Sequence, residues 1–338
     1  MSTIAPSCTK VMLRLKEHAQ ATSDETENLY NYLNALADSG QRTKIKDVSK
    51  FMLCLQSDSG NTDIGLACYE EFHPGQLQSQ LYPLMSSATL GDALLLLSRL
   101  SAILSDGAPL LVLEEPDSFS VVFLRLELLN LSRSYIDCYF ATLIGIVHWL
   151  LPFNKVVPVA TTFSYEAPVD TSKLKVLFGE NLTFSNLINK ITISVHDWNQ
   201  KLPTGFPELK IHHDNLVNLE IQNFPVKMSS VVKNHIVSGL ATGVVVSLES
   251  IASAMNLSPR MLRNRLDEEQ TGVRELLDES RLQLARHLIG TTDQSSAVIA
   301  KGLGFQEVSS FYRACNRWFG CSPAAYRLKA ASGTKASG

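Results

Sequence analysis

The sequence has few of the features that mark a metalloprotein, a disulfide-stabilised secreted protein or a hydrolase. Its six cysteines are scattered, none belongs to a CxxC pair, and no histidines cluster near them. This spacing argues against a zinc site and a disulfide framework, so we predict unpaired cysteines in a reducing cytoplasm. The chain also contains no P-loop, GxSxG or HExxH motif, and we expect no catalytic residues, no metal and no cofactor.

Long hydrophobic runs are missing as well. The most apolar stretch, residues 135–151, contains Asp137 and His148 and is too short to span a bilayer comfortably. Residues 1–20 lack the continuous apolar run of a signal peptide. We therefore expect a cytoplasmic protein without a membrane partner, and we interpret 135–151 as a buried helix.

Neither sign of charge dominates the 338-residue chain, and its net charge of −3 argues against a general nucleic-acid binder. The charge is unevenly distributed, however. From Pro225 onward there are 14 Lys and Arg against 9 Asp and Glu, a net charge of +5, which leaves −8 for the rest. This asymmetry favours an acidic domain joined to a basic domain that binds an anionic partner.

The N-terminal part of the chain combines helical and strand patterns, which predicts an α+β domain. A helix over 89–104 can begin at the Thr89 cap, and its leucines recur on one face. Two runs rich in Val, Leu and Phe flank EEPDS within 108–127, as in a β-hairpin. The other expected elements are helices within 1–60, the buried helix 135–151, a strand over 156–165, and a strand, a turn and a second strand over 182–195.

Prolines and a glycine between residues 203 and 225 then favour a linker. The last residues, KAASGTKASG, have the composition of a frayed end. We accordingly expect an N-terminal domain, a linker, a C-terminal domain and a flexible tail, at 1–203, 204–226, 227–328 and 329–338.

The C-terminal domain contains a weak internal repeat. Ile251-Ala252 recurs 48 residues later as Ile299-Ala300, and Gly272 recurs as Gly320. Each copy has the pattern of two short helices around a tight turn. The caps and turn residues that predict these helices are Ser247, Ser258, Ser295 and Gly304. A helix-turn-helix of this kind inserts the N-terminal part of its second helix into the DNA major groove.

The second helix of each copy has an apolar back and a polar front. Leu262 and Leu266 lie four residues apart and predict one buried face, while Phe311 anchors the other helix. The outward residues suit DNA recognition, because arginine reads guanine, asparagine reads adenine and serine contacts bases or phosphate. They are Arg260, Arg263 and Asn264 in the first copy and Ser309, Ser310 and Arg313 in the second.

A helix over 273–289 separates the two copies and would be about 26 Å long. Successive major-groove segments on one face of a duplex are roughly 34 Å apart, so two reading helices held closer than that require the DNA to bend. A single helical hairpin is more often an ordinary amphipathic surface structure. Two copies on the basic side of the chain favour DNA binding.

Residues 228–328 resemble the DNA-binding domain of the AraC/XylS family of bacterial transcription regulators. The resemblance rests on I-A-x-x-L-G-F (299–305), S-x-F-x-R (309–313), R-W-x-G-x-S-P-x-x-Y-R (317–327), L-S-x-R-x-L-x-x-R-L (257–266) and R-E-L-L-D-E-x-R (274–281). It implies that the outward residues of the two copies read bases in successive groove segments and that Arg317 holds phosphate. It also implies promoter DNA and RNA polymerase as partners, with activation as the commoner mode of regulation.

The N-terminal domain resembles, more loosely, the effector-binding and dimerisation domain of one branch of this family, with an arabinose-binding-type or ornithine-regulator-like fold. The similar segments are 63–75, 86–100 and 178–203. The resemblance implies a homodimer and a small-molecule effector, such as an amino acid or another small metabolite. The candidate pocket residues, which are equally compatible with simple core packing, are Tyr135, Tyr139, His148 and Trp149.

We therefore expect an α+β N-terminal effector/dimerisation domain followed by an all-α C-terminal domain with two helix-turn-helix units joined by a linker helix. The expected function is sequence-specific transcription regulation, most simply activation controlled by a small-molecule effector or by dimerisation. Two alternatives stay open. The N-terminal domain could bind a protein partner and no metabolite, or it could be an enzyme fused to a DNA-binding domain.

Overall fold

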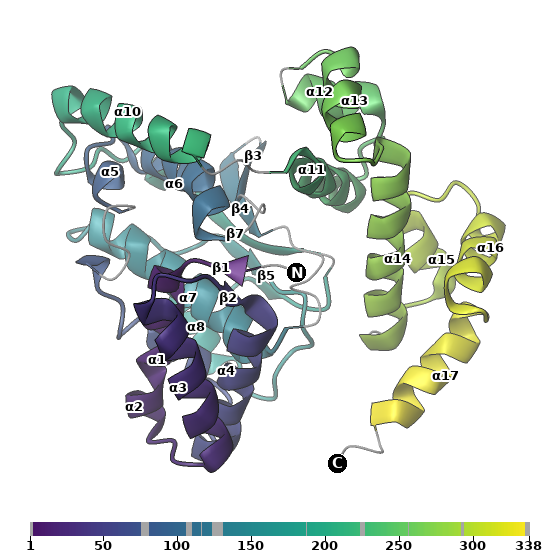
Figure 1. Cartoon of the computed structure of the whole chain (residues 1–338), viewed down its shortest axis with the longest axis horizontal. Coiled ribbons are helices and arrows are strands. Elements are labelled where there is room, and N and C mark those ends of the chain that lie inside the picture. The colour runs from purple at the N-terminus through teal and green to yellow at the C-terminus, as the bar shows by residue number, and fades with distance from the viewer. Residues whose placement is uncertain are drawn as a thin grey trace.

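The computed structural model describes residues 3–75, 81–105, 110–115, 117–123, 131–186, 188–223, 227–255, 257–291 and 294–334. They form a mixed α/β N-terminal part and a helical C-terminal part, which lie side by side (Figure 1). Both expected classes of structure are therefore present.

Helices occupy most of the first sixty residues, as the sequence predicts. α3 (Asp24–Asp38) begins at Ser23, whose hydroxyl accepts a hydrogen bond from the Thr26 backbone N–H over 3.3 Å. α4 (Ile45–Ser59) ends at Gly60, whose φ of 63° suits a residue without a side chain. The other elements of this region are β1 (Thr3–Ile4), α1 (Pro6–Leu13), α2 (Leu15–Ala19), β2 (Thr43–Lys44) and the 3₁₀ helix η1 (Ile64–Cys68).

A five-stranded sheet with the order β3-β4-β7-β5-β6 lies beside these helices. β3 (Leu111–Glu115) and β4 (Ser118–Phe123) form the predicted antiparallel hairpin. β4 pairs antiparallel with β7 (Asn189–Ser194), and β7 pairs antiparallel with β5 (Ala160–Thr162). β5 in turn pairs parallel with β6 (Leu182–Thr183), which forms the edge.

One strand expectation needs correction: the strand predicted over 156–165 is limited to the 3 residues of β5. Both strands predicted over 182–195 are present, as β6 and β7, and β5 lies between them in the sheet. Hydrophobic pattern locates strands in the sequence, whereas strand order depends on contacts between distant segments.

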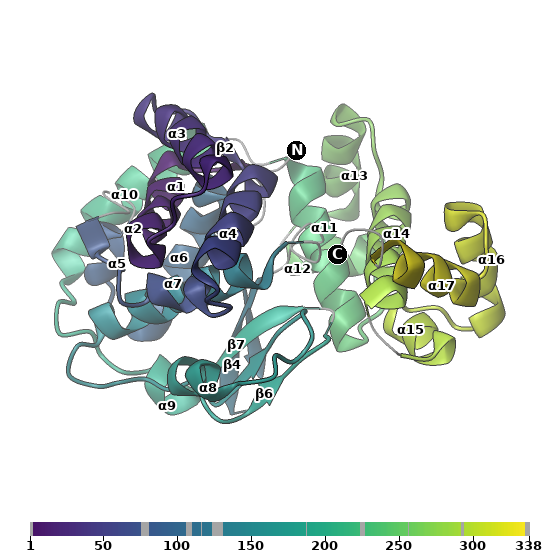
Figure 2. The ribbon, with the colours of Figure 1, turned by 90° about the horizontal axis from the view of Figure 1, so that it is seen from below.

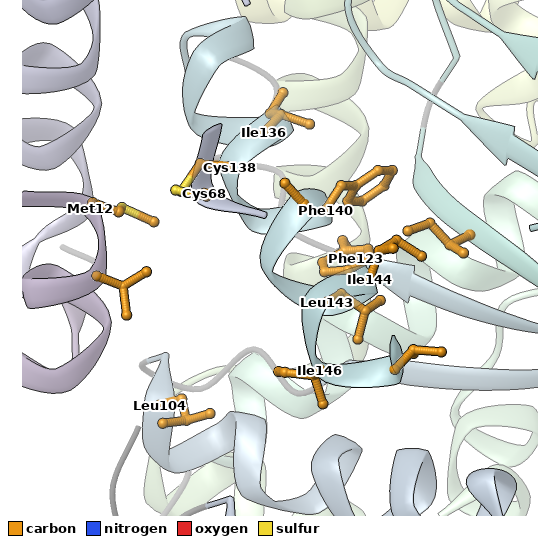
Figure 3. Packing of buried hydrophobic residues seen from close by; sticks show 14 of the residues in the cluster. Met12, Cys68, Leu104, Phe123, Ile136, Cys138, Phe140, Leu143, Ile144 and Ile146 are labelled. Atoms are coloured by element: carbon orange, nitrogen blue, oxygen red, sulfur yellow. A yellow bond between two sulfur atoms is a disulfide. The ribbon is translucent and has the colours of Figure 1, made fainter. Parts of the chain in front are cut away.

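Two apolar helices pack with this sheet in one core. α6 (Leu90–Leu104) begins at Thr89 with a capping box: the Thr89 hydroxyl accepts from the Asp92 N–H (3.1 Å), and the Asp92 carboxylate accepts from the Thr89 N–H (3.2 Å). α7 (Arg133–Leu150) is buried along most of its length, as predicted. Its Phe140 ring lies 4.5 Å from the Phe123 ring of β4, centroid to centroid (Figure 3).

A charged cluster is buried at the start of α7. The Asp137 carboxylate accepts a hydrogen bond from the Tyr165 hydroxyl and lies 3.0 Å from Arg133 Nε, and Asp137 is fully buried. Arg133 also pairs with Asp63, next to η1. Burial raises the pKa of Asp137 to about 7, although the positive charge of Arg133 opposes this shift.

The prediction that all cysteines are unpaired is wrong for two of them. Cys68 of η1 and Cys138 of α7 form a disulfide, with their Cα atoms 5.3 Å apart (Figure 3). They are separated by 70 residues, so local spacing gives no sign of the pair. The free cysteines are Cys8, Cys54, Cys315 and Cys321. The inference of a reducing compartment from unpaired cysteines therefore loses its basis.

The expected linker and tail also differ from the structure. α10 (Pro207–Asn223) occupies most of 204–226 and packs against α5 (Tyr82–Met85) and α6, and its Val217 joins the N-terminal core. Pro207 starts this helix, because proline lacks only an N–H that the first turn leaves unpaired. The helix α17 (Pro323–Thr334) extends through 329–334, where a flexible tail was expected, and 335–338 lie outside the described residues.

Two further elements, α8 (Ser172–Phe178) and α9 (Val195–Trp198), complete the N-terminal part. None of the helices in the described segments combines the length and hydropathy that crossing a bilayer requires. Among the same described residues, no three His, Cys, Asp or Glu side chains gather as a metal site would require.

A count of thiols tests the disulfide. Protein purified and denatured without reductant should react with about four equivalents of a thiol reagent, and with about six after reduction, because Cys68 and Cys138 are joined. In the Cys68→Ser, Cys138→Ser double variant the two counts should agree. Six reactive thiols in the unreduced wild type would contradict the pairing.

Replacing Asp137 with Asn should flatten the pH dependence of stability. The folded-state pKa of Asp137 lies above the unfolded value, so its contribution is greatest at low pH and is lost as the pH rises towards 7. One proton changes the free energy of unfolding by at most about 1.4 kcal/mol per pH unit. Chemical denaturation between about pH 4 and pH 7 should show the steeper decline for the wild type.

The exposed Asp170 provides the matched control for that experiment. Hydrogen bonds from Ser172 lower the pKa of Asp170, so the Asp170→Asn variant should keep the wild-type slope above about pH 4. Equal slopes for the wild type and Asp137→Asn would contradict the raised pKa.

Candidate nucleic-acid interface

The C-terminal helices pack around α14 (Val273–Thr291), which confirms the helix predicted over 273–289 (Figure 2). One side of α14 is buried against α11 (Met228–Thr242). The core that these two helices share includes Val232, Ile236, Leu240, Leu276, Leu284 and Leu288. The spacing of these residues along each helix is that of one apolar stripe.

α12 (Leu248–Ala254) and α13 (Pro259–Glu268) form the first pair of short helices. Both predicted caps are present: the hydroxyls of Ser247 and Ser258 accept backbone N–H groups over 3.1 Å and 3.2 Å. Pro259 stands in the first turn of α13, where its missing N–H costs no hydrogen bond. The two helices therefore begin where local chemistry predicts.

α15 (Ser296–Gly302) and α16 (Val308–Phe319) form the second pair. Ser295 caps α15 by accepting the Val298 N–H over 3.3 Å. Between the helices, Gly304 has a φ of 70°, which a residue with a side chain rarely adopts, so the predicted turn glycine is confirmed.

Arg281 of α14 fixes this second turn. Its Nε donates to the Leu303 carbonyl (2.8 Å) and its Nη2 to the Gly304 carbonyl (2.9 Å). The guanidinium also lies 4.7 Å from the centroid of the Phe305 ring. The sequence alone assigned no role to Arg281. Its place as the last residue of the R-E-L-L-D-E-x-R motif is the feature that could have identified it as a functional residue.

The predicted base-reading residues of the first pair share one solvent-facing side of α13. Leu262 and Leu266 are buried, and the opposite side of the helix exposes Arg260, Arg263 and Asn264. Arginine at such a position can donate two hydrogen bonds to a guanine edge, and asparagine can donate one hydrogen bond to adenine and accept another from it.

In the second pair, Phe311 is fully buried while Ser309 and Arg313 are exposed and Ser310 is half-buried. Arg313 Nη2 donates to Ser310 Oγ over 2.9 Å, and Ser309 Oγ donates to the Glu307 carboxylate over 3.0 Å. All three polar side chains lie in the N-terminal half of α16, the part of a recognition helix that meets the groove.

Arg317 is placed differently. Its Nη2 lies 2.7 Å from Asp278 of α14, and Trp318 Nε1 donates to the same carboxylate over 3.3 Å. Asp278 thus ties the C-terminal half of α16 to α14. The ion pair is about half exposed, so it contributes little to stability. Arg317 can therefore leave Asp278 and bind another anion in its place. Phosphate binding by Arg317 stays a prediction, and it requires that exchange.

The structure separates the four residues that were candidates for the effector pocket. Tyr135 and Tyr139 line a cavity between α1, α6 and α7. His148 is not among the lining residues of that cavity: its Nε2 donates to the Val156 carbonyl (2.7 Å) and its Nδ1 accepts from the Tyr69 hydroxyl (2.8 Å). Burial lowers the pKa of His148, which agrees with a neutral ring. Trp149 packs half-buried against the core.

Comparison with known families places both halves of the chain. Residues 33–202 match the model described as the arabinose-binding domain of AraC transcription regulator, N-terminal part, and residues 251–329 match a helix-turn-helix domain. The first match covers half of the chain. This protein belongs to the AraC family of transcription regulators.

The relatives match only part of the chain. The chain is 35% identical over 85 residues to a helix-turn-helix transcriptional regulator of Mycobacterium tuberculosis, covering 25% of each chain. It is 38% identical over 82 residues to the transcriptional activator NphR of a Rhodococcus species, covering 24% of each. The match thus spans about a quarter of the length of these relatives.

A solved structure is also similar to the chain. The DNA-binding transcriptional dual regulator of Escherichia coli K-12 is 31% identical to it. The alignment covers 31% of this chain and 94% of that one, with a TM-score of 0.30.

Proposed function

We propose that this chain is a sequence-specific DNA-binding transcription regulator in which α12–α13 and α15–α16 are two helix-turn-helix units joined by α14. The observation that supports this most is the matching exposure pattern of α13 and α16. Each buries an apolar back and presents arginine, asparagine or serine at its N-terminal half. The net charge of +5 from residue 225 onward favours DNA as the partner of that surface.

The length of α14 constrains how both units bind at once. Its 19 residues span about 28 Å, less than the roughly 34 Å between major-groove segments one turn apart. Straight DNA therefore does not satisfy both units fully, unless the recognition helices tilt. We propose that the target DNA bends towards the protein, so that sequence-dependent flexibility adds to specificity.

Within this complex, we assign base reading in one groove segment to Arg260, Arg263 and Asn264, base reading in the next segment to Ser309, Ser310 and Arg313, and phosphate contact to Arg317. The partners are promoter DNA and RNA polymerase in the cytoplasm. Activation is the mode we favour, and the similarity to NphR, a named activator, supports it.

We further propose that the N-terminal part is a sensor and dimerisation unit for a homodimer. The match to an arabinose-binding domain model supports a small-molecule effector. Because α10 packs against α5 and α6, we extend this unit from the expected boundary at residue 203 to Asn223. The C-terminal unit then begins with α11.

Arg263→Ala should relax sequence specificity, and Arg265→Ala should not. Both arginines are exposed on α13, but they lie about 160° apart around the helix, and only Arg263 shares a face with Arg260, three residues before it. On DNA selected from a random pool by the wild type, loss of a bidentate base contact costs about 1–3 kcal/mol at one base pair. Binding to a panel of single-base variants measures the effect.

The binding panel distinguishes a contact to a base from a contact to the phosphate backbone. If Arg263→Ala weakens binding equally on every DNA of the panel, Arg263 contacts phosphate and the assigned role is wrong. An equal specificity loss in Arg265→Ala would contradict the orientation of α13. Salt titrations of each variant report how many phosphate contacts remain.

Control by an effector predicts that DNA affinity changes in the presence of cell metabolites. The full chain should bind its selected DNA with a different Kd in a protein-free metabolite extract, because an effector must favour one conformation of the two units. Heating the extract and passing it through a size filter removes proteins, so that a change in Kd does not come from a protein partner. An unchanged Kd, together with a co-purifying protein, would favour the protein-binding alternative.

A further inference from the structure

The cavity beside Tyr135 lies inside the N-terminal part, where three helices meet. Its walls come from α1, α6 and α7, and its volume is about 70 Å³. Its lining includes Met12 of α1, Leu104 of α6 and Ile146 of α7, and Figure 3 shows these side chains on the three helices. Closely packed interiors contain few spaces larger than a water molecule.

Among the residues that the structure describes, no charged side chain lines this cavity, and the hydroxyls of Ser101 and Thr142 already have partners. The Ser101 hydroxyl donates to the Ser98 carbonyl (2.6 Å) and accepts from the Leu110 N–H (2.6 Å). The Thr142 hydroxyl donates to the Cys138 carbonyl over 2.8 Å. Burial raises the pKa of the Cys8 thiol to about 11, so Cys8 is neutral near pH 7.

These surroundings select against polar ligands. A sugar or an amino acid would bury several hydroxyl, ammonium or carboxylate groups against walls that are mostly apolar, and burial of such groups is costly. A hydrocarbon group loses nothing by leaving water and gains contacts with the walls. The volume is about half that of the roughly 150 Å³ cavity known to bind benzene, which favours a slender aliphatic group over an aromatic ring.

We propose that this cavity binds an uncharged aliphatic hydrocarbon group, either a small molecule or the end of a longer chain. The proposal rests on the sensor role of the N-terminal part and names the chemical class of its effector. It differs from the amino acid that the sequence resemblance offers as an example of the effector.

A continuous set of contacts leads from the cavity towards the DNA-binding part. Tyr139 lines the cavity and lies edge-on to Phe123 of β4, with ring centroids 4.6 Å apart. The neighbouring Val122 points to the other face of the sheet, where it is buried with Val237 of α11. A ligand that shifts α7 against the sheet therefore acts on a helix of the C-terminal core.

The test uses the full chain with 1-hexanol and decanoate as aliphatic probes, toluene as an aromatic probe, and L-arabinose as a polar control. Saturating 1-hexanol should raise the Tm by about 5 °C, while L-arabinose should not change it. A shift with 1-hexanol alone indicates a small molecule, whereas a larger shift with decanoate indicates the end of a longer chain. A response to L-arabinose alone would overturn the proposal.

Cys8 gives a second measurement at the site itself. Modification of Cys8 by a small maleimide, followed by mass spectrometry, should slow in proportion to the occupied fraction, while modification of Cys54 on α4 should not change. The cavity-filling variant Val11→Phe should lose the 1-hexanol response. If Val11→Phe does not fold, Cys8 protection in the wild type decides alone, and its absence would overturn the proposal.

DNA binding by the same samples separates this proposal from the proposed function. Protection of Cys8 with a changed Kd for DNA supports both. Protection of Cys8 with an unchanged Kd supports the hydrocarbon site and contradicts its role as a sensor. Normal DNA binding without protection overturns the site and leaves the DNA-binding function intact.

Discussion

Both proposed reading helices depend on one packing contact, the burial of the apolar stripe along α14. Leu276 lies towards one end of this stripe, and Leu284 and Leu288 lie towards the other. α11 covers it, and the same buried cluster includes the anchors of α13 and α16, Leu266 and Phe311. Because such a core is closely packed, α14 holds the two proposed reading helices at a fixed separation. That separation is the constraint that DNA has to meet.

Helix α11 packs both in the C-terminal core and against the N-terminal sheet. Ile236 of α11 is buried in the C-terminal core, while the adjacent Val237 is buried against Val122 of the N-terminal sheet. A change in the sheet therefore acts directly on a helix that supports both units. This arrangement offers a physical route for effector control without a long chain of intermediates, and it requires only that the ligand prefer one arrangement of the two parts.

Features that rest on neighbouring residues were predictable from sequence. The caps at Ser247, Ser258 and Ser295 and the turn at Gly304 follow from hydrogen bonds and backbone geometry within a few residues. Features that rest on distant partners were not predictable. The Cys68–Cys138 disulfide and the Arg133–Asp63 ion pair exist because η1 docks on α7. The Asp278–Arg317 pair likewise joins helices that are separated in sequence.

The most direct test of the central claim is a hydroxyl-radical footprint of the full chain on DNA that it selects from a random pool. Two units held by α14 predict two protected segments on one face of the duplex, roughly 10 base pairs apart for each bound chain. The same DNA should migrate as bent when the protein is bound. A single protected segment for each chain, or protection of opposite faces of the duplex, would contradict the account.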